Sequence, residues 1–348
     1  MKLATVIGPD GLPQIGALID GDKSIALLQA GLVALEGAPA PHFASMIAFL
    51  HTGAEAQYKA YMVQDFVASK APAGTVMPAA DTTFLSPLPI PESIRDAMAF
   101  EEHIINSIRA AGLGPLARFD ETLEKWFGRR RSIAYLLNRA WYKRPIYYKG
   151  NRFSVIGHGG VVRMPAYTEQ FDFELEWGVV IGKGGRDIPH TSARDHIAGY
   201  TIFNDFSARD IQMQEMKGRL GPAKGKDFDT GNAIGPWLVT PDEISDPYNL
   251  TMTARVNGEE WSRGATGDMH WTFEKIISYI SRSETLYPGE FIGSGTCSGS
   301  QGKGSGLELG RTLKAGDVVE LEVEDIGILQ NRIAPPLKGA TRHGSRKR

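Results

Sequence analysis

Residues 171–179 read FDFELEWGV, and the character of their side chains alternates along the stretch. The apolar positions are Phe173, Leu175, Trp177 and Val179. A spacing of two residues is typical of a β-strand with one buried face, so Glu174 and Glu176 share the opposite face. At about 6.5–7 Å apart, two such carboxylates can converge on one cation. On this stretch alone, a solvated strand face is the favoured interpretation.

Short β-like runs separated by glycine and proline dominate the chain beyond residue 85. Helical spacing interrupts them at residues 100–111 and 272–281. This pattern predicts an α+β, β-rich domain over residues 85–340, followed by a basic tail at residues 341–348.

The first part of the chain has a different pattern. Residues 1–35 hold brief apolar runs split by turn sequences, which indicates short strands, and residues 41–65 show helical spacing. Residues 72–91 contain several prolines and little periodicity, as in a linker. We therefore expect a small N-terminal β-rich domain with a helix and linker over residues 1–84.

Composition excludes several classes of protein. A net charge of −2 over 348 residues argues against binding to nucleic-acid phosphates. The single cysteine, Cys297, excludes an internal disulfide and a multi-thiolate zinc site, and we interpret it as a small packing residue. No apolar run approaches the roughly 20 residues that cross a bilayer, and no signal-peptide pattern is evident. We therefore expect a cytoplasmic protein.

A second group of polar residues follows a strand-like run at residues 199–203. If the next turn is helical, Asp205, Arg209 and Gln212 lie at i, i+4 and i+7 and project from one face. A surface ion pair explains the spacing equally well. Asp96 and His103 also lie seven residues apart, where a helical pattern would place them on one face, although a surface histidine is the simpler interpretation.

The glycines at residues 291–299 are too frequent for a plain strand and indicate backbone close to a ligand, with a flexible loop as the alternative. Phosphate-binding loops are excluded, because neither Gly-Lys pair precedes Ser or Thr. The chain also lacks the HExxH motif of zinc proteases.

Taken in order, several segments resemble the fumarylacetoacetate hydrolase family over residues 90–330. The matching segments are Asp96 with His103, Tyr148-Lys149-Gly150, FELE at 173–176, FNDFSARDIQ at 203–212, GKDF at 225–228, GSGT at 293–296 and LEL at 307–309. The resemblance implies a mixed-sheet β-roll preceded by a small β domain, and assembly as a homodimer.

The resemblance also implies a set of site residues. The metal ligands it implies are Asp96, Glu174, Glu176 and Asp205. An all-carboxylate shell favours Mg²⁺ or Mn²⁺, with Ca²⁺ as a further candidate, over zinc. The catalytic residues it implies are His103, Glu308, Lys226, Arg209 and Gln212, with Tyr148, Thr296, Arg209 and Gln212 binding substrate.

By this resemblance, the function is hydrolysis of a carbon–carbon bond in a small diketo acid, such as an acylpyruvate or a fumarylacetoacetate-like compound. His103, oriented by Glu308, would deprotonate the attacking water, and the leaving carbon would depart as an enolate. Arg209, Gln212 and Lys226 would donate to the developing oxyanions.

Two alternatives stay open. A decarboxylase, isomerase or sugar-acid dehydratase of the same family would stabilise an enolate without an attacking water. A non-catalytic metal- or ligand-binding protein is the third reading. Met98 and Gly112 depart from the substrate-contacting residues of fumarylacetoacetate hydrolase itself, which leaves the exact substrate open, and Arg109 is the candidate replacement for the missing arginine.

Overall fold

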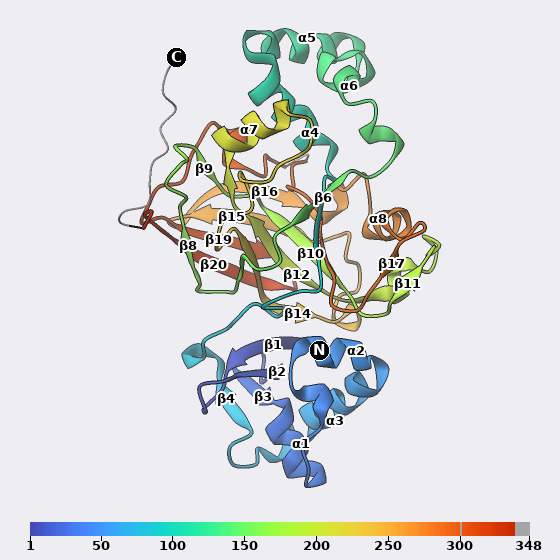
Figure 1. Ribbon diagram of the computed structural model, residues 1–348, viewed down its shortest axis with the longest axis vertical. Helices are drawn as coiled ribbons and strands as arrows, with labels where there is room; N and C mark the ends of the chain where they lie inside the picture. The colour runs from blue at the N-terminus through green and yellow to red at the C-terminus, as the bar shows by residue number, and fades with distance from the viewer. Residues whose placement is uncertain (300, 338–348) are drawn as a thin grey trace.

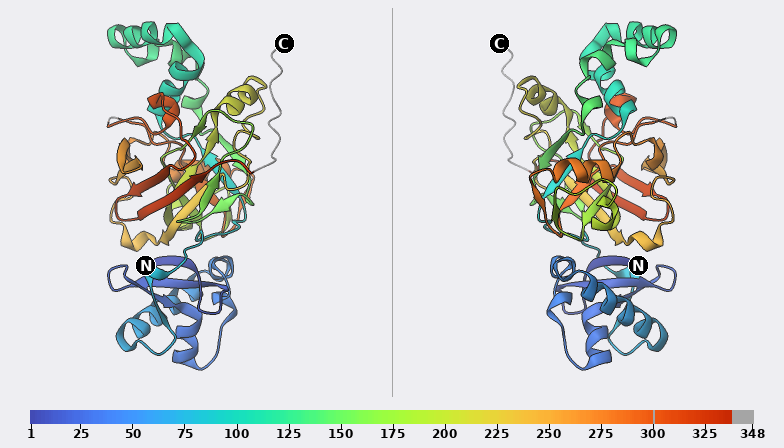
Figure 2. Two further views of the ribbon diagram at one scale, coloured as in Figure 1. Left: turned by 90° about the vertical axis from the view of Figure 1, so that its left-hand side faces the viewer. Right: turned by 90° about the vertical axis from the view of Figure 1, so that its right-hand side faces the viewer.

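The computed structural model describes residues 1–299 and 301–337. A small lobe built from the N-terminal residues lies at one end of the molecule, and a larger, sheet-rich lobe follows it (Figure 1). Helices between residues 101 and 137 protrude from the far end of the larger lobe, as the side views also show (Figure 2). The division at residue 85 stays a prediction, because the main sheet continues through both lobes.

The small lobe pairs a four-stranded sheet segment with three helices. Its elements are β1 (Lys2–Ile7), β2 (Pro13–Ile19), β3 (Ser24–Leu27), α1 (Leu28–Glu36), α2 (Met46–Thr52), α3 (Ala54–Lys70) and β4 (Val76–Pro78). The expectation of strands throughout residues 1–35 was wrong for α1. A Cβ added to Gly31 on α1 would lie 2.5 Å from Val63 on α3, so glycine permits these two helices to pack closely.

The main sheet of the large lobe is mixed, as expected for an α+β fold. Its strands are β5 (Ile94–Ala97), β6 (Tyr147–Gly150), β7 (Val155–Ile156), β10 (Glu176–Ile181), β12 (Ile197–Asp205), β14 (Asn232–Val239) and β18 (Phe291–Gly293). Six of them run in the order β14-β12-β10-β18-β5-β6, and β7 pairs with β14 in parallel. β1 is antiparallel to β14, and β5 is parallel to β18.

A second sheet of five strands packs against one face of β10 and β12. Its strands are β8 (Val161–Arg163), β15 (Thr251–Val256), β16 (Glu259–Ala265), β19 (Val318–Val323) and β20 (Gly327–Ala334). Two short pairs complete the strands, β9 (Phe171–Asp172) with β13 (Ser207–Ala208) and β11 (Gly185–Arg186) with β17 (Thr285–Leu286).

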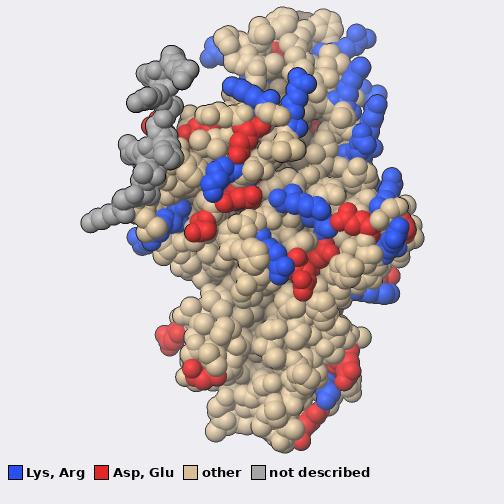
Figure 3. Space-filling model, viewed as in Figure 1, with Lys and Arg blue, Asp and Glu red and all other residues tan. Residues whose placement is uncertain are grey.

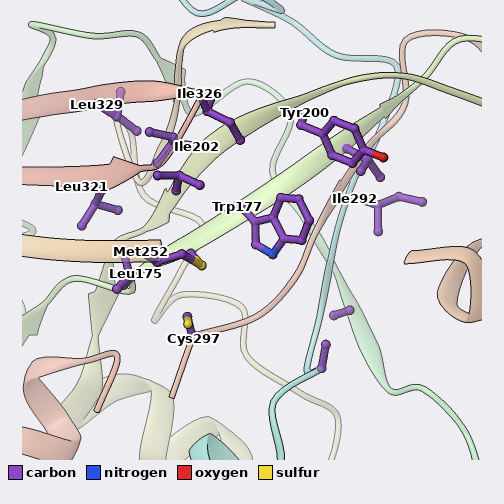
Figure 4. Close-up of a cluster of buried hydrophobic side chains, with 14 of the residues drawn as sticks. Leu175, Trp177, Tyr200, Ile202, Met252, Ile292, Cys297, Leu321, Ile326 and Leu329 are labelled. Carbon is purple, nitrogen blue, oxygen red and sulfur yellow. The ribbon is translucent and has the colours of Figure 1, made fainter. Parts of the chain in front are cut away.

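The core between these sheets joins Trp177 and Tyr200 to Met252 and Leu321 (Figure 4). Cys297 is fully buried in the same cluster, which agrees with its interpretation as a packing residue. Val180, on the opposite face of β10, is buried in another apolar cluster that extends into the small lobe. The expectation of one strand with a single buried face over residues 171–179 was therefore wrong. Residues 173–175 separate β9 from β10, and Glu174 and Glu176 are both buried.

The larger lobe also contains helices. They are α4 (Glu101–Ile108), α5 (Ala117–Phe127), α6 (Ile133–Leu137), α7 (Arg209–Lys217), α8 (Phe273–Ile280) and α9 (Gly306–Leu309). The two helices expected at residues 100–111 and 272–281 are present, the first continuing beyond α4 as a π-helical turn at Arg109–Leu113. Within the described ranges, no helix is long and apolar enough to cross a membrane.

Candidate metal and catalytic site

Strand register places four polar side chains on one face of the main sheet. Asp96 on β5 pairs with Tyr148 on β6, and Glu176 on β10 pairs with Phe203 on β12. Because side chains alternate, Asp205 lies on the same face as Phe203, two residues earlier. Asp96, Tyr148, Glu176 and Asp205 are thus brought to one side by neighbouring strands.

Asp96 and Glu176 form a compact cluster with a third carboxylate, that of Glu174. One oxygen each of Asp96, Glu174 and Glu176 lies within 4.8 Å of the others, and all three residues are buried. Such a separation lets three carboxylate oxygens converge on a hard divalent cation. The structure thereby brings together three of the four metal ligands implied by sequence resemblance.

A glycine-rich segment holds the cluster from one side. The N–H of Gly295, which has φ +75°, donates to Asp96 Oδ1 and Glu176 Oε2, each at 3.1 Å. A Cβ on Gly293 would lie 2.5 Å from Asp96 Oδ1, so no larger residue fits there without displacing the carboxylate. The glycine backbone thus contacts the carboxylates of the cluster, and its expected proximity to a ligand stays a prediction.

Asp205 adjoins the cluster through different contacts. Its Oδ2 accepts from Lys226 Nζ and from the Tyr148 hydroxyl, each at 2.5 Å. Lys226 also donates to Glu174 Oε2 at 2.8 Å. The ammonium therefore bridges one carboxylate of the cluster and Asp205, so Lys226 is placed beside the candidate metal position.

Burial and crowding of like charges shape the ionisation of this group. Burial, then the nearby carboxylates, raises the pKa of Asp96 and of Glu176 well above the usual range. Burial also raises the pKa of Asp205, to about 6, against the opposing effect of Lys226. Burial works against the charged form of Glu174 too, but Lys226 and Arg209 hold the pKa of its carboxyl below the usual range.

A divalent cation suits these donors. Glu176 Oε1 and Asp205 Oδ1 are buried oxygens without a hydrogen-bond partner among the described residues. Unpartnered buried carboxylate oxygens are costly, and a cation would satisfy them and offset the crowded negative charge. Carboxylate oxygens are the ligands that Mg²⁺ and Mn²⁺ prefer, so the residues present fit either ion.

A buried network fixes Arg209 at the start of α7. Its Nε donates to Asp172 Oδ2 at 2.6 Å, its Nη1 lies 2.7 Å from Glu174 Oε1, and Nη1 also donates to Gln212 Oε1 at 2.9 Å. The remaining nitrogen, Nη2, is buried and has no partner among the described residues. Arg209 therefore retains one donor that a substrate oxygen would satisfy.

Asp172 was missed by the sequence analysis. Besides binding Arg209, its carboxylate accepts from the N–H groups of Gly306 and Leu307, at 2.7 and 2.9 Å. These N–H groups belong to α9, which carries Glu308. Alternation placed Asp172 among solvent-facing residues, and only the fold reveals that it joins α7 to α9.

His103 and Glu308 form a buried pair although they are 205 residues apart. His103 Nδ1 lies 3.1 Å from Glu308 Oε2. Glu308 also accepts from the hydroxyls of Ser298 and Ser305 and from the N–H of Gly304. Burial works against its charge, but His103 and these donors lower the pKa of Glu308.

Ser305 connects the pair to the carboxylate cluster, because its hydroxyl donates to Glu308. His103 contributes to lowering the pKa of Glu174, and the backbone of Glu174 forms a bridge with Ser305. The structure therefore assembles, around one group of carboxylates, a histidine with an orienting glutamate, a buried ammonium and a buried guanidinium.

Three expectations about local geometry were wrong. Asp96 lies on strand β5 and His103 on α4, so they share no helical face. Asp205 ends β12, and α7 begins only at Arg209. Arg109, the candidate for a substrate carboxylate, instead pairs with Asp120 at 2.9 Å and Glu124 at 2.5 Å in the helical protrusion.

Thr296 and Tyr148 complete the predicted set. Thr296 is buried directly after Gly295, and the Tyr148 hydroxyl already binds Asp205. Their roles in substrate binding stay predictions. The basic tail at 341–348 lies outside the described residues.

Comparison with known proteins places these features in a family. Residues 129–334 match the model of the fumarylacetoacetate (FAA) hydrolase C-terminal domain. The chain is 39% identical over 193 residues to human mitochondrial oxaloacetate tautomerase FAHD2A, covering 55% of this chain and 59% of that protein. It is 36% identical over 192 residues to the oxaloacetate tautomerase YisK of Bacillus subtilis, covering 55% and 62%. The chain thus matches about three fifths of the length of these relatives.

Solved structures share the fold over nearly the whole chain. A fumarylacetoacetate hydrolase from Exiguobacterium antarcticum has a TM-score of 0.69 and 23% identity, covering 96% of this chain and all of that one. Maleylpyruvate hydrolase from Sphingobium sp. SYK-6, solved with manganese(II) and pyruvate, has a TM-score of 0.66 and 20% identity, covering 97% and 100%.

The family model begins after Asp96 and His103, so their assignment to the site depends on the geometry described above. The matched range includes Glu174, Glu176, Asp205 and Lys226, and it spans more than half of the 348 residues. The chain belongs to the fumarylacetoacetate hydrolase family.

Proposed function

We propose that this protein is a divalent-metal-dependent enzyme that enolises a small 2-oxo dicarboxylic acid, interconverting keto and enol forms of an oxaloacetate-like substrate. The observation that carries the proposal is the buried His103–Glu308 pair beside the cluster of Asp96, Glu174 and Glu176. The oxaloacetate tautomerases FAHD2A and YisK support this choice among the reactions of the family.

Enolisation moves a proton from the carbon next to a ketone to the ketone oxygen. When bound by Asp96, Glu174 and Glu176, Mg²⁺ or Mn²⁺ would supply Lewis-acid stabilisation of negative charge on that oxygen. His103 would accept the carbon-bound proton, while Glu308 fixes the orientation of its ring and stabilises the imidazolium that forms.

The remaining residues would hold the substrate. Arg209 has a buried donor, Nη2, for a substrate carboxylate, and Gln212 lies beside it. Burial opposes the charge of Lys226, but Asp205 and Glu174 raise its pKa, so it remains an ammonium that can donate to an enolate oxygen. Tyr148 and Thr296 are proposed to contact further substrate oxygens.

Hydrolysis of a carbon–carbon bond in a diketo acid is the second candidate. The oriented His103–Glu308 pair also favours this reaction, because it can take a proton from water as readily as from carbon. Water would add to one ketone, the bond to the neighbouring carbon would break, and that carbon would leave as an enolate to be protonated. Both reactions therefore share an enolate and differ in where His103 removes a proton.

A substrate panel separates the two reactions. The full chain is incubated with Mg²⁺ or Mn²⁺ and either oxaloacetate enol or an acylpyruvate, and keto product or released acids are quantified. Faster ketonisation without acid release supports the tautomerase. Two acids released per acylpyruvate favour the hydrolase. No reaction with either compound, with metal bound, would contradict both proposals and favour a binding protein.

Assembly and location are proposed separately. We propose a homodimer from the family resemblance alone, tested by sedimentation at micromolar concentration. The human and bovine FAHD2A relatives are mitochondrial and YisK is bacterial. The cytoplasm therefore stays a prediction for this chain, to be checked by fractionation.

A further inference from the structure

A cavity lined by several cationic side chains lies away from the carboxylate cluster. It has a volume of about 190 Å³ and is lined by residues of three segments, namely the stretch before β6, His190 and the outer face of α8. On β6, Tyr148 reaches Asp205, whereas the neighbouring Tyr147 packs against the apolar core that contains the buried face of α8. Because side chains alternate along a strand, the cavity lies beside the face opposite the catalytic cluster.

One face of α8 and its ends form one wall of the cavity. Trp271, Lys275, Tyr279 and Arg282 recur at intervals of three or four residues along α8 and its ends, so they share one face. The opposite face of α8 is buried in the core. Lys275 lies over the Trp271 ring at 6.0 Å and Arg282 over the Tyr279 ring at 5.6 Å, contacts that orient both cations.

The other wall adds two further cations, Lys143 and Arg144. Four cationic side chains therefore line the cavity, and no aspartate or glutamate lines it. In the part of the chain that the structure describes, none of the four forms an ion pair. Lys and Arg side chains gather along the right-hand edge of the face seen in Figure 3, with Asp and Glu side chains among them.

Nearby acids are engaged elsewhere. Glu274 accepts from the Tyr248 hydroxyl at 2.6 Å, and Glu284 pairs with Arg95 at 2.5 Å. Asp187 accepts from the N–H of Ser283 at 2.8 Å. None of these carboxylates lines the cavity itself, so an external anion would relieve the repulsion among its cations.

We propose that this cavity is a binding site for a small phosphate-bearing anion. A phosphoryl group carries about −1.5 to −2 charges, so one or two of them match four cations better than a single carboxylate does. The guanidinium forks of Arg144 and Arg282 suit bidentate contact with phosphate oxygens, and Ser278 adds a hydroxyl. The small volume favours a compact ligand.

Calorimetric titration with pyrophosphate tests the proposal on the full chain at about 0.15 M salt, where surface charges are partly screened. The Lys275→Gln/Arg282→Gln double variant should weaken binding at least tenfold. The control is Lys314→Gln/Arg332→Gln, which removes the same charge at exposed positions outside the cavity and should bind as the unaltered chain does.

Two further arms identify the site and the ligand class. An Arg209→Gln variant, altered at the catalytic cluster, should retain binding, and succinate should bind more weakly than pyrophosphate. Absence of saturable binding, equal binding by the cavity variant, or loss of binding in Arg209→Gln would overturn the proposal. Succinate binding as tight as pyrophosphate would overturn its assignment to phosphate.

Discussion

His103 Nδ1 and Glu308 Oε2 lie 3.1 Å apart in a buried contact that joins α4 to α9. Glu308 is held by two serine hydroxyls and a backbone N–H, so the histidine has a fixed orienting partner. A general base needs such a partner to keep its proton-accepting nitrogen directed at the substrate.

Replacing this histidine should remove most turnover. We expect His103→Ala to lower kcat about 10²–10⁴-fold while metal affinity changes little, because His103 is not one of the clustered carboxylates. Steady-state kinetics and Mn²⁺ titration measure the two quantities. The matched control is His51→Ala. His51 lies outside the site and is exposed, and its Nε2 is 3.3 Å from Glu92 Oε1. Equal kcat values for the two variants would contradict the role of His103.

Glu176→Gln should abolish tight metal binding. Its Oε1 is buried without a partner, and an amide would bring neutral donors into the cluster. We expect both Mn²⁺ binding and activity to fall below detection, as they should after chelation of the unaltered protein. Glu322→Gln, which alters a surface carboxylate paired with Arg255, serves as the control. Retained metal affinity in Glu176→Gln would place the cation elsewhere.

Metal should stabilise the fold more at high pH than at low pH. Burial raises the pKa of Asp96 and Glu176, and that of Asp205 to about 6, so the folded metal-free protein holds protons that the unfolded chain releases. This proton binding stabilises the folded metal-free protein, and the stabilisation is lost as pH rises through the raised pKa values. A bound cation then replaces the protons. Differential scanning calorimetry should show a larger metal-induced rise in Tm near pH 8 than near pH 5.5, and equal rises would contradict this linkage.

Lys226→Met should separate metal binding from catalysis. Lys226 lies 2.8 Å from Glu174 Oε2, so its charge opposes a cation at the same carboxylate. We expect Mn²⁺ to bind at least as tightly in the variant, while kcat falls because a donor to the enolate is lost. Lys224→Met, at an exposed position two residues earlier, is the control. Loss of metal affinity in Lys226→Met would show that the lysine instead preserves the geometry of the ligands.

Asp172 should act as a positioning residue. It ties Arg209 to the first N–H groups of α9, so Asp172→Asn should raise KM more than it lowers kcat, because Arg209 is proposed to hold the substrate. The control is Asp120→Asn, which alters a buried aspartate that pairs with Arg109 outside the site. If both variants lose stability but neither changes KM, Asp172 has only a structural role.

The comparison of sequence and structure shows what local patterns can reveal. The helical spacing at residues 272–281 depends on neighbouring residues, and the helix predicted from it is present, whereas alternation around Glu174 predicted a single buried face that the fold does not have. The contact of Asp96 with the cluster depends on parallel pairing of β5 with β18, nearly 200 residues away, and spacing alone misplaced Asp96 on a helix with His103. Resemblance supplied the ligand set that periodicity could not.

The burial and the partners of individual side chains could not be predicted from local sequence patterns either. Asp172 has the spacing of a solvent-facing residue, yet its partners come from α7 and α9. Arg109 is close in sequence to Gly112, where the family's substrate arginine is missing, but α5 supplies the carboxylates that engage Arg109. These contacts depend on how distant elements pack, which one sequence does not specify residue by residue.

The most direct test is hydrogen–deuterium exchange at the carbon beside the ketone of oxaloacetate, followed by NMR in deuterated buffer with Mg²⁺ or Mn²⁺. Exchange reports proton removal from carbon. The account predicts metal-dependent exchange well above that of Glu176→Gln, measured as the background, and its loss in His103→Ala. Exchange equal in all three proteins, or unchanged by chelation, would contradict metal-assisted enolisation at this site.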